Sequence, residues 1–203
     1  MRAAGIDPSL SAFTIAAGEV HGNLPALVRF ELVPALPPSN VLEDRIARYE
    51  ALGEAAAERL LILRPELVLL EGYSYNSRGS VVQLGECGGL VRRAILDASY
   101  DRRNARQRFR VLEIAPAMLK RFACGKGNGK KAAIGSALAA RYGQTFETDD
   151  QADAYGLLRL ALIVLAAAPP TTATERDVAL EIRAVLEGRA PTKKPKKKRP
   201  AAA

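Results

Sequence analysis

The chain has 203 residues, which is enough for one sizeable α/β domain and too few to count on two. Hydrophobic residues make up 48% and charged residues 26%, a balance that excludes a disordered or collagen-like chain. The net charge is +8. We expect a cytoplasmic protein, because no uncharged apolar run reaches the ~18 residues that cross a bilayer and the first residues lack a signal-peptide core.

The first half of the chain predicts an antiparallel meander followed by a helix and a buried strand. Three short apolar runs separated by turn residues are typical of strands: residues 3–7, 13–17 and 28–33. After a proline-rich break, apolar residues recur at helical spacing over residues 42–60, with Ser39 or Asn40 as the expected N-cap. Residues 67–70 form a run too short and too apolar for a surface helix, so we expect a strand buried on both faces that ends at Glu71.

The second half predicts helices around one further strand at residues 109–114. The expected helices cover residues 81–98, 116–122, 130–142, 149–168 and 175–187. Gly85, Gly88 and Gly89 lie inside the first of these, where each costs ~1 kcal/mol, so we expect another backbone to approach closely there. From Arg189 onward the composition predicts disorder. A meander followed by alternating helices and strands predicts an α/β fold with a mixed sheet covered on both faces.

Positive charge is concentrated in two segments. Residues 193–199 carry six cations and no acid, and residues 102–131 carry ten cations against the single acid Glu113. The rest of the chain is therefore net negative, so the molecule should have a basic face, which is typical of a polyanion binder. We expect the internal segment to lie on elements that lead to the functional site. A solvated basic extension that serves solubility is the alternative for the tail.

Four acidic residues stand where an apolar core should exclude them. Asp7 and Glu71 each close an apolar strand, and Asp150 and Asp153 open the most hydrophobic helix, three residues apart on one helix face. If the two strands are parallel neighbours, their carboxylates meet at one edge of the sheet. Asp149 or Asp150 as a simple helix cap is the alternative.

The metal that such a cluster would hold follows from the ligands that the chain offers. Cys87 and Cys124 are the only cysteines and His21 is the only histidine, which leaves neither a disulfide framework nor a Cys/His zinc site. Converging carboxylates without a cation would repel one another, so a divalent ion held by oxygen is expected, either Mg²⁺ or Mn²⁺.

Four segments in order form a recognisable pattern. They are Gly5-Ile6-Asp7-Pro8-Ser9, Leu70-Glu71-Gly72-Tyr73 with the glycines of the following helix, Pro116 to Lys131 with its Lys120 and Gly-Lys-Gly spacing, and Asp150-Gln151-Ala152-Asp153-Ala154. Together they resemble the RuvC family of Holliday-junction resolvases, in the RNase H-like superfamily, over residues 1 to about 168. Ser9 departs from the pattern, since the family usually has glycine there.

The resemblance implies a fold and an activity. The fold would be an RNase H-like three-layer α/β/α domain with a mixed five-stranded sheet over residues 1–170, followed by a C-terminal helix at 171–188 and a disordered basic tail at 189–203. The activity would be that of a crossover junction endodeoxyribonuclease, which cuts branched DNA by two-metal phosphodiester hydrolysis. Such a protein would act as a homodimer through the helix at 81–98, near the nucleoid or in a host cytoplasm if phage-encoded.

The resemblance also implies residue roles. Two Mg²⁺ ions, with Mn²⁺ as a substitute, would be held by Asp7, Glu71, Asp150 and Asp153. Lys131 would sit near the scissile phosphate. The DNA backbone would be held by Lys120, Arg121, Lys126 and Lys130. Tyr73 or Tyr75 would stack on a base at the branch point, with strand-end packing as the equally weighted alternative.

Other functions remain open at this point. Sugar-kinase and actin-like ATPases begin with a similar strand, but they need two such domains and a Gly-rich adenosine motif. A nuclease of the same fold that cuts hybrids, flaps or forks fits the basic segment, as does a non-catalytic DNA-binding module. Four buried acids without a metal would be costly, which disfavours the non-catalytic module.

Overall fold

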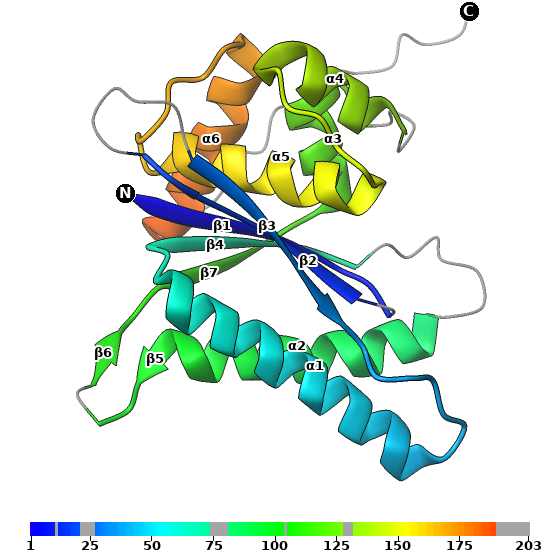
Figure 1. Cartoon of the computed structure of the whole chain (residues 1–203). Helices are drawn as coiled ribbons and strands as arrows, with labels where there is room; N and C mark the ends of the chain where they lie inside the picture. Colours follow the sequence, from blue (N-terminus) through cyan, green and yellow to red (C-terminus); the bar gives the residue numbers. More distant parts are fainter. Residues whose placement is uncertain (11, 21–26, 74–80, 104, 128–131, 190–203) are drawn as a thin grey trace, which may run out of the picture.

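The computed structural model describes the chain except for residues 11, 21–26, 74–80, 104, 128–131 and 190–203. A five-stranded sheet lies at its centre with helices on both faces, which confirms the predicted architecture (Figure 1). The strands are β1 (Arg2–Pro8), β2 (Ala12–Glu19), β3 (Leu27–Pro34), β4 (Leu67–Glu71), β5 (Tyr100–Asp101), β6 (Arg106–Gln107) and β7 (Arg110–Ile114). The helices are α1 (Leu42–Leu63), α2 (Val81–Ser99), α3 (Pro116–Cys124), α4 (Ala132–Tyr142), α5 (Asp149–Val164) and α6 (Ala173–Leu186). No helix among the described residues combines the length and apolar character needed to cross a membrane.

The order of strands in the sheet is β3-β2-β1-β4-β7. The first three form the predicted antiparallel meander, and β4 and β7 then add in parallel to β1. Ile6 of β1 pairs with Leu70 of β4, so the two residues that follow, Asp7 and Glu71, reach the same edge of the sheet. This register meets the condition that the sequence analysis set for a shared carboxylate site.

The two central strands are buried on both faces, as predicted for β4. Leu67 and Leu69 point into the apolar layer beneath α5, and Val68 and Leu70 point into the layer beneath α1 and α2. Alternate side chains of a strand lie on opposite faces, so a continuous apolar run is what a doubly covered strand requires.

The start of α1 differs from its prediction. Val41 is the N-cap and offers no side-chain hydrogen bond. The Ser39 hydroxyl instead accepts a hydrogen bond from the Val41 backbone N–H at 3.1 Å and donates one to Asp44 at 2.8 Å. Ser39 therefore fixes the conformation of the residues that precede the helix, but it is not the N-cap.

The glycines of α2 also differ from expectation. A Cβ at Gly88 would meet the side chains of Tyr73 and Arg92, whereas a Cβ at Gly85 or Gly89 would meet nothing within 4 Å. The predicted close approach of another backbone is therefore wrong within this chain. Gly85 and Gly89 lie on the open side of the helix.

A two-stranded hairpin, β5–β6, follows α2 and was not predicted. Its strands have two residues each, too short for a periodic pattern to reveal. The hairpin projects beyond the C-terminal end of α2 (Figure 1).

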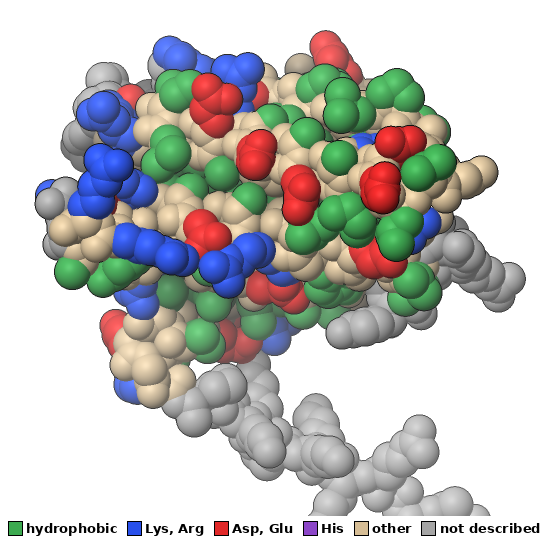
Figure 2. Space-filling model, turned by 90° about the horizontal axis from the view of Figure 1, so that it is seen from below, with side chains coloured by type: hydrophobic (Ala, Val, Ile, Leu, Met, Phe, Trp, Pro, Cys, Tyr) green, Lys and Arg blue, Asp and Glu red, His purple; other side chains and the backbone are tan. Residues whose placement is uncertain are grey.

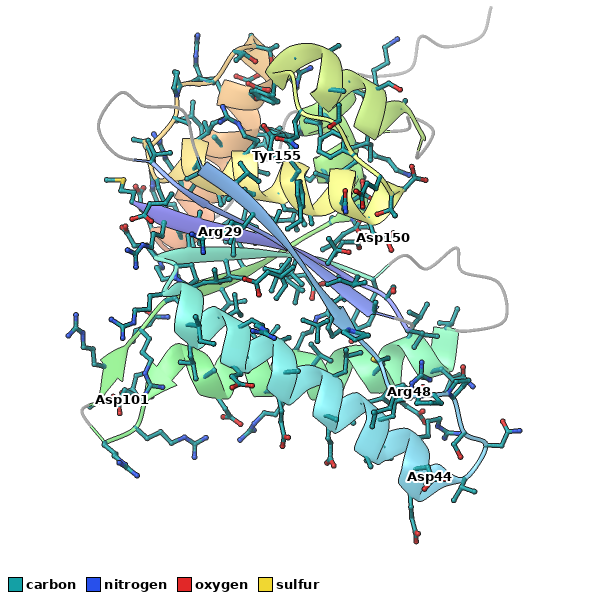
Figure 3. All side chains as sticks on the ribbon, viewed as in Figure 1. Arg29, Asp44, Arg48, Asp101, Asp150 and Tyr155 are labelled. Atoms are coloured by element: carbon teal, nitrogen blue, oxygen red, sulfur yellow. The ribbon has the colours of Figure 1, made fainter. Side chains whose placement is uncertain are left out.

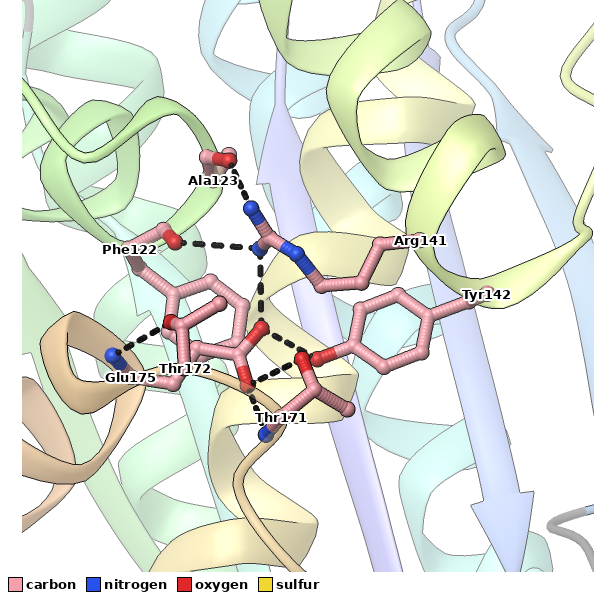
Figure 4. Close-up of polar contacts among 7 residues, drawn as sticks. All are labelled: Phe122, Ala123, Arg141, Tyr142, Thr171, Thr172 and Glu175. Atoms are coloured by element: carbon pink, nitrogen blue, oxygen red, sulfur yellow. Dashed lines mark hydrogen bonds and ion pairs between the residues drawn. The ribbon is translucent and has the colours of Figure 1, made fainter.

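The last helix, α6, is fixed by a fully buried acid, Glu175 (Figure 4). Its carboxylate accepts hydrogen bonds from the Arg141 guanidinium at 2.8 Å, the Tyr142 hydroxyl and both the backbone N–H and the hydroxyl of Thr171. Burial alone would raise the pKa of Glu175, but these hydrogen bonds and the Arg141 charge lower it below its ordinary value of 4.5. The network thus joins α4 to α6.

Glu175→Gln should destabilise the protein at pH 7 by about 2 kcal/mol, because it removes one charge from a buried, hydrogen-bonded pair. A depressed carboxyl pKa stabilises the fold above the unfolded value and loses that contribution as the pH falls through the folded value. The difference between the two proteins in urea unfolding should therefore be full at pH 7 and shrink below pH 4.5. A difference independent of pH would show that the charge of Glu175 does not contribute.

Candidate active site

Three carboxylates meet at the carboxyl edge of the parallel strands. Asp7 ends β1, Glu71 ends β4 and Asp153 lies in the second turn of α5, and their ligand oxygens all lie within 4.8 Å of one another. Asp7 is 5% exposed and Asp153 is 2% exposed, whereas Glu71 is half-buried. Buried carboxylates at such short separation are the donor set for a hard divalent cation, so these residues fit the predicted metal.

A single glycine allows α5 to come this close to β1. A Cβ at Gly5 would lie 2.2 Å from the Ala154 carbonyl oxygen and 2.4 Å from the Leu158 backbone nitrogen, far inside van der Waals contact. Only a residue without a side chain permits this contact between helix and strand. Since Asp153 precedes Ala154 and Asp7 lies two residues after Gly5, the same contact brings the two acids together.

The metal-free cluster is electrostatically strained. The pKa of Asp7 is raised to about 10, mainly by burial and further by its hydrogen bond with Glu71 and the charges of Glu71, Asp153 and Asp150. At neutral pH the cluster therefore retains a proton on Asp7 when no cation is bound. A cation that replaces this proton would relieve the repulsion between the acids.

Asp150 faces the same site. It lines a cavity of about 220 Å³ together with Asp7 and Glu71, and its charge contributes to the raised pKa of Asp7. The cap of α5 is Thr148, whose hydroxyl accepts a hydrogen bond from the Gln151 backbone N–H at 3.1 Å. Neither Asp149 nor Asp150 is therefore the cap. Figure 3 shows Asp150 at the end of α5 that meets the edge of the sheet.

The basic residues of the internal segment do not form one surface. Four cations lie in or beside the β5–β6 hairpin, which follows the C-terminal end of α2: Arg102, Arg103, Arg106 and Arg108. The cavity, in contrast, is lined by residues 84, 87 and 88, which lie in the N-terminal half of α2. Asp101 on the hairpin and Asp150 at the site lie at opposite sides of the molecule (Figure 3). Viewed from the side of α1 and α2, Lys and Arg side chains gather toward one end (Figure 2). The expectation that all of residues 102–131 lead to the site is wrong for the hairpin.

Of the remaining cations of that segment, Arg110 begins β7 and binds the Leu186 carbonyl oxygen of α6, and the others follow in or after α3, which starts just beyond the end of β7. The charges of Lys120 and Asp153 both act on the pKa of the Cys124 thiol, which burial raises. Lys126 follows the C-cap of α3, and a Cβ at the next residue, Gly127, would lie 3.1 Å from the Ala117 carbonyl oxygen. This part of the chain therefore folds back toward the start of α3.

The other residues that were predicted to contact DNA differ from one another in their surroundings. Arg121 forms an ion pair with Glu181 of α6. Tyr73 lines the cavity, with the guanidinium of Arg92 4.0 Å from its ring centroid. Lys130, Lys131 and Tyr75 lie outside the described residues.

Two residues beside the site were missed by sequence reasoning. Arg92 of α2 lines the cavity and forms an ion pair of 2.6 Å with Glu113 of β7. One lies on a helix and the other on a strand, and neither residue belongs to a motif. Only the tertiary structure brings them together.

Asp7→Asn should stabilise the metal-free protein at pH 8. A carboxyl whose pKa is raised from 3.8 to about 10 keeps a proton that the unfolded chain releases, so stability falls as pH rises between these values. Removing this group should raise the melting temperature in EDTA at pH 8 by at least ~3 °C, equivalent to about 1 kcal/mol. The gain should vanish at pH 4. A variant less stable than the wild type at both pH values would refute this account of Asp7.

Comparisons with known proteins agree with the architecture. No family model and no curated protein matches the chain. Among solved structures, RuvC of Thermus thermophilus matches with a TM-score of 0.59 and 24% identity over 84% of this chain and 99% of that one. The same protein in complex with a Holliday junction substrate matches with a TM-score of 0.57 and 24% identity over 78% and 90% of the two chains. The yeast mitochondrial Holliday junction resolvase Ydc2 matches with a TM-score of 0.58 and 12% identity over 92% and 83%. The predicted resemblance is thus confirmed in the fold, which is RNase H-like and similar to that of these resolvases.

Proposed function

We propose that this protein is a divalent-metal-dependent endonuclease that cuts branched DNA of the four-way, Holliday-junction type. The observation that carries the proposal is the convergence of Asp7, Glu71 and Asp153 within 4.8 Å, at the edge of a sheet whose fold resembles that of junction resolvases. An intact acid cluster supports a catalytic protein over a DNA-binding module, because burying these charges without a function would only destabilise the fold.

The roles of the acids follow from their positions. One divalent ion would be held by Asp7, Glu71 and Asp153. Asp150 lines the same cavity and would complete the ligands of a second divalent ion. Bound divalent ions would supply a nucleophilic water and stabilise the leaving 3′ oxygen in an in-line displacement at phosphorus. Asp7 would lose its proton when the site fills, so its carboxylate becomes available as a ligand only then.

DNA contacts are assigned by chemistry and position. Backbone phosphates would be bound by Lys120 in α3, by Lys126 just after that helix and by Lys130. Lys131 would offset charge at the scissile phosphate. The basic tail at residues 193–199 would add contacts that depend on salt and not on DNA structure.

We also propose that the protein is a homodimer that pairs through α2. The open side of this helix carries Val82, Gly85, Gly89 and Leu96, which are exposed, and a Cβ at either glycine would meet none of the described residues within 4 Å. Small residues flanked by apolar ones permit two helices to approach closely. A dimer would present two acid clusters to two strands of one junction.

Gly89→Arg should convert the dimer to a monomer without unfolding it, because the position is open within one chain but would be crowded between two. Light scattering of the variant should give about half the mass of the wild type, with an unchanged circular dichroism spectrum. An equal mass for both proteins would place any dimer contact elsewhere.

The function is tested with purified protein in Mg²⁺ against four-way, three-way, flap and linear DNA substrates of matched sequence. We expect cleavage of the four-way junction at a rate at least ~10-fold above that of the linear duplex. Preferential cutting of flaps or forks would support the proposed nuclease activity but assign it a different substrate. No cutting of any substrate, with binding retained, would favour the non-catalytic module.

A further inference from the structure

We propose that Arg92 is a positioning residue that holds Glu71 in place for metal binding from outside the acid cluster. This inference rests on the proposed function, since it concerns the metal site assigned above. It adds a residue that belongs to none of the sequence motifs. Arg92 lies on α2, whereas the three acids lie on β1, β4 and α5.

The guanidinium of Arg92 uses each of its nitrogens on a different partner. Nη2 donates to the Glu71 carbonyl oxygen at 3.1 Å, Nη1 donates to the Gly88 carbonyl oxygen at 3.2 Å, and Nε donates to Glu113 at 2.6 Å. The group also lies over the ring of Tyr73, with 4.0 Å between the Arg92 Cζ and the ring centroid. The Arg92 side chain is 17% exposed, so its bonds to the two carbonyl oxygens are partly shielded from water, whereas Glu113 is half exposed.

These contacts act at the point where β4 ends. Glu71 is its last residue and pairs with Ile114 of β7, and the backbone N–H of Gly72 donates to the Ile114 carbonyl oxygen at 2.8 Å. On the β1 side the parallel pairing stops one residue earlier, at Ile6 and Leu70. Beyond this last pair of β1 and β4, the Glu71 carbonyl oxygen accepts its hydrogen bond from a side chain, that of Arg92.

Two glycines leave the space that this arrangement needs. A Cβ at Gly72 would lie 2.8 Å from Glu113 Oε1, and a Cβ at Gly88 would lie 2.6 Å from Arg92 Nη1 and 2.5 Å from the Tyr73 hydroxyl oxygen. Gly72 follows Glu71 directly and Gly88 lies one helical turn before Arg92. Both positions are thus shaped around the arginine, its acid partner and the tyrosine.

The arrangement requires arginine and not merely a cation. Three differently directed N–H groups and a planar face are all in use, and a lysine ammonium would supply neither the fork nor the flat surface. Glu113 has a second effect, because its ion pair holds the Arg92 guanidinium through Nε, and Glu113 itself does not line the cavity. Arg92 lines the same cavity as Asp7 and Glu71, so an arginine released from Glu113 could compete with a metal for their carboxylates.

The test uses full-length Arg92→Lys, Arg92→Gln and Glu113→Gln, with Arg93→Gln as the matched control. Arg93 is the adjacent residue on α2, is exposed and forms an ion pair within the helix, with Asp97. Mn²⁺ affinity is measured by calorimetry, and amide hydrogen exchange of Gly72 is followed without metal. Single-turnover cleavage is measured across Mn²⁺ and junction concentrations.

We expect all three variants at Arg92 and Glu113 to weaken Mn²⁺ binding by about 10- to 100-fold, the range usual for residues that support metal ligands. The Gly72 amide should exchange faster in Arg92→Gln. The junction concentration for half-maximal rate should stay unchanged, and high Mn²⁺ should restore most of the rate in Arg92→Lys. A variant that is only partly folded would lower the amplitude of single-turnover cleavage, whereas a weakened metal site lowers the rate constant at low Mn²⁺ and leaves the amplitude unchanged.

The inference is overturned if the Arg92 variants match Arg93→Gln in Mn²⁺ affinity and in Gly72 exchange. If the wild type still binds Mn²⁺ and cuts DNA in the same experiment, the proposed function is unaffected by this outcome. If the wild type itself binds no Mn²⁺, the proposed function fails and the role of Arg92 fails with it. The two failures are therefore distinguished by the wild-type titration.

Discussion

Asp153→Asn should lower the rate of junction cleavage by about three orders of magnitude or more while leaving junction affinity within about twofold of the wild type. The carboxylate is 2% exposed and shares its surroundings with Asp7 and Glu71, so its charge serves the cation rather than the DNA. Asparagine keeps the shape of the side chain and removes one of the repelling charges, so the fold should tolerate it. Single-turnover cleavage and binding measured in Ca²⁺ separate the two quantities.

The matched control for this change is Asp177→Asn, on the exposed surface of α6. It changes the net charge by the same amount and should leave both cleavage and affinity at wild-type levels. Cleavage by Asp153→Asn within tenfold of the wild type would remove this residue from the site. Loss of junction affinity in Asp153→Asn alone would mean that the acid acts through DNA binding.

Gly5→Ala should destabilise the protein by roughly 3 kcal/mol or more, because the added methyl group would meet backbone atoms that cannot rotate away. The nearest are the Ala154 carbonyl oxygen at 2.2 Å and the Leu158 nitrogen at 2.4 Å. To relieve the overlap, α5 must move away from β1 and carry Asp153 away from Asp7. The variant should therefore also bind Mn²⁺ at least ~10-fold more weakly at a temperature where it remains folded.

Gly135→Ala, inside α4, is the control for this substitution. A Cβ there would make only ordinary van der Waals contacts, the nearest with Ala152 Cβ at 3.4 Å, and alanine is favoured over glycine inside a helix by about 1 kcal/mol, so this variant should be as stable as the wild type or more so. Urea unfolding of both variants gives the comparison. Equal stability of Gly5→Ala and the wild type would show that the contact between β1 and α5 is not as close as described.

Much of the fold follows from the sequence because its signals are local. The apolar run that forms β4 is readable as a doubly buried strand, and the meander is readable from its turns. Asp7 and Glu71 were expected to meet because acids at the ends of parallel neighbours share an edge. The cap of α5 was expected, if an acid served as cap, at Asp149 or Asp150, whereas the hydrogen bond from the Gln151 N–H selects Thr148, which sequence reasoning did not consider.

What sequence reasoning missed depends on tertiary placement. The basic segment is continuous in sequence but is divided in space, because the β5–β6 hairpin turns away at the far end of α2 while α3 returns to the edge of the sheet. The pairing of Arg92 with Glu113 joins residues 21 apart on different elements, and the contact of Gly5 with Ala154 spans most of the chain. No periodicity or spacing encodes such contacts.

The central claim is that the carboxylates of Asp7, Glu71 and Asp153 hold a divalent ion. The most direct measurement is an anomalous difference map from crystals of the protein grown with Mn²⁺. We predict a peak between these three carboxylates that is lost in crystals of Asp153→Asn. A map with no peak there, or with Mn²⁺ bound only at other acids of the surface, would contradict the account.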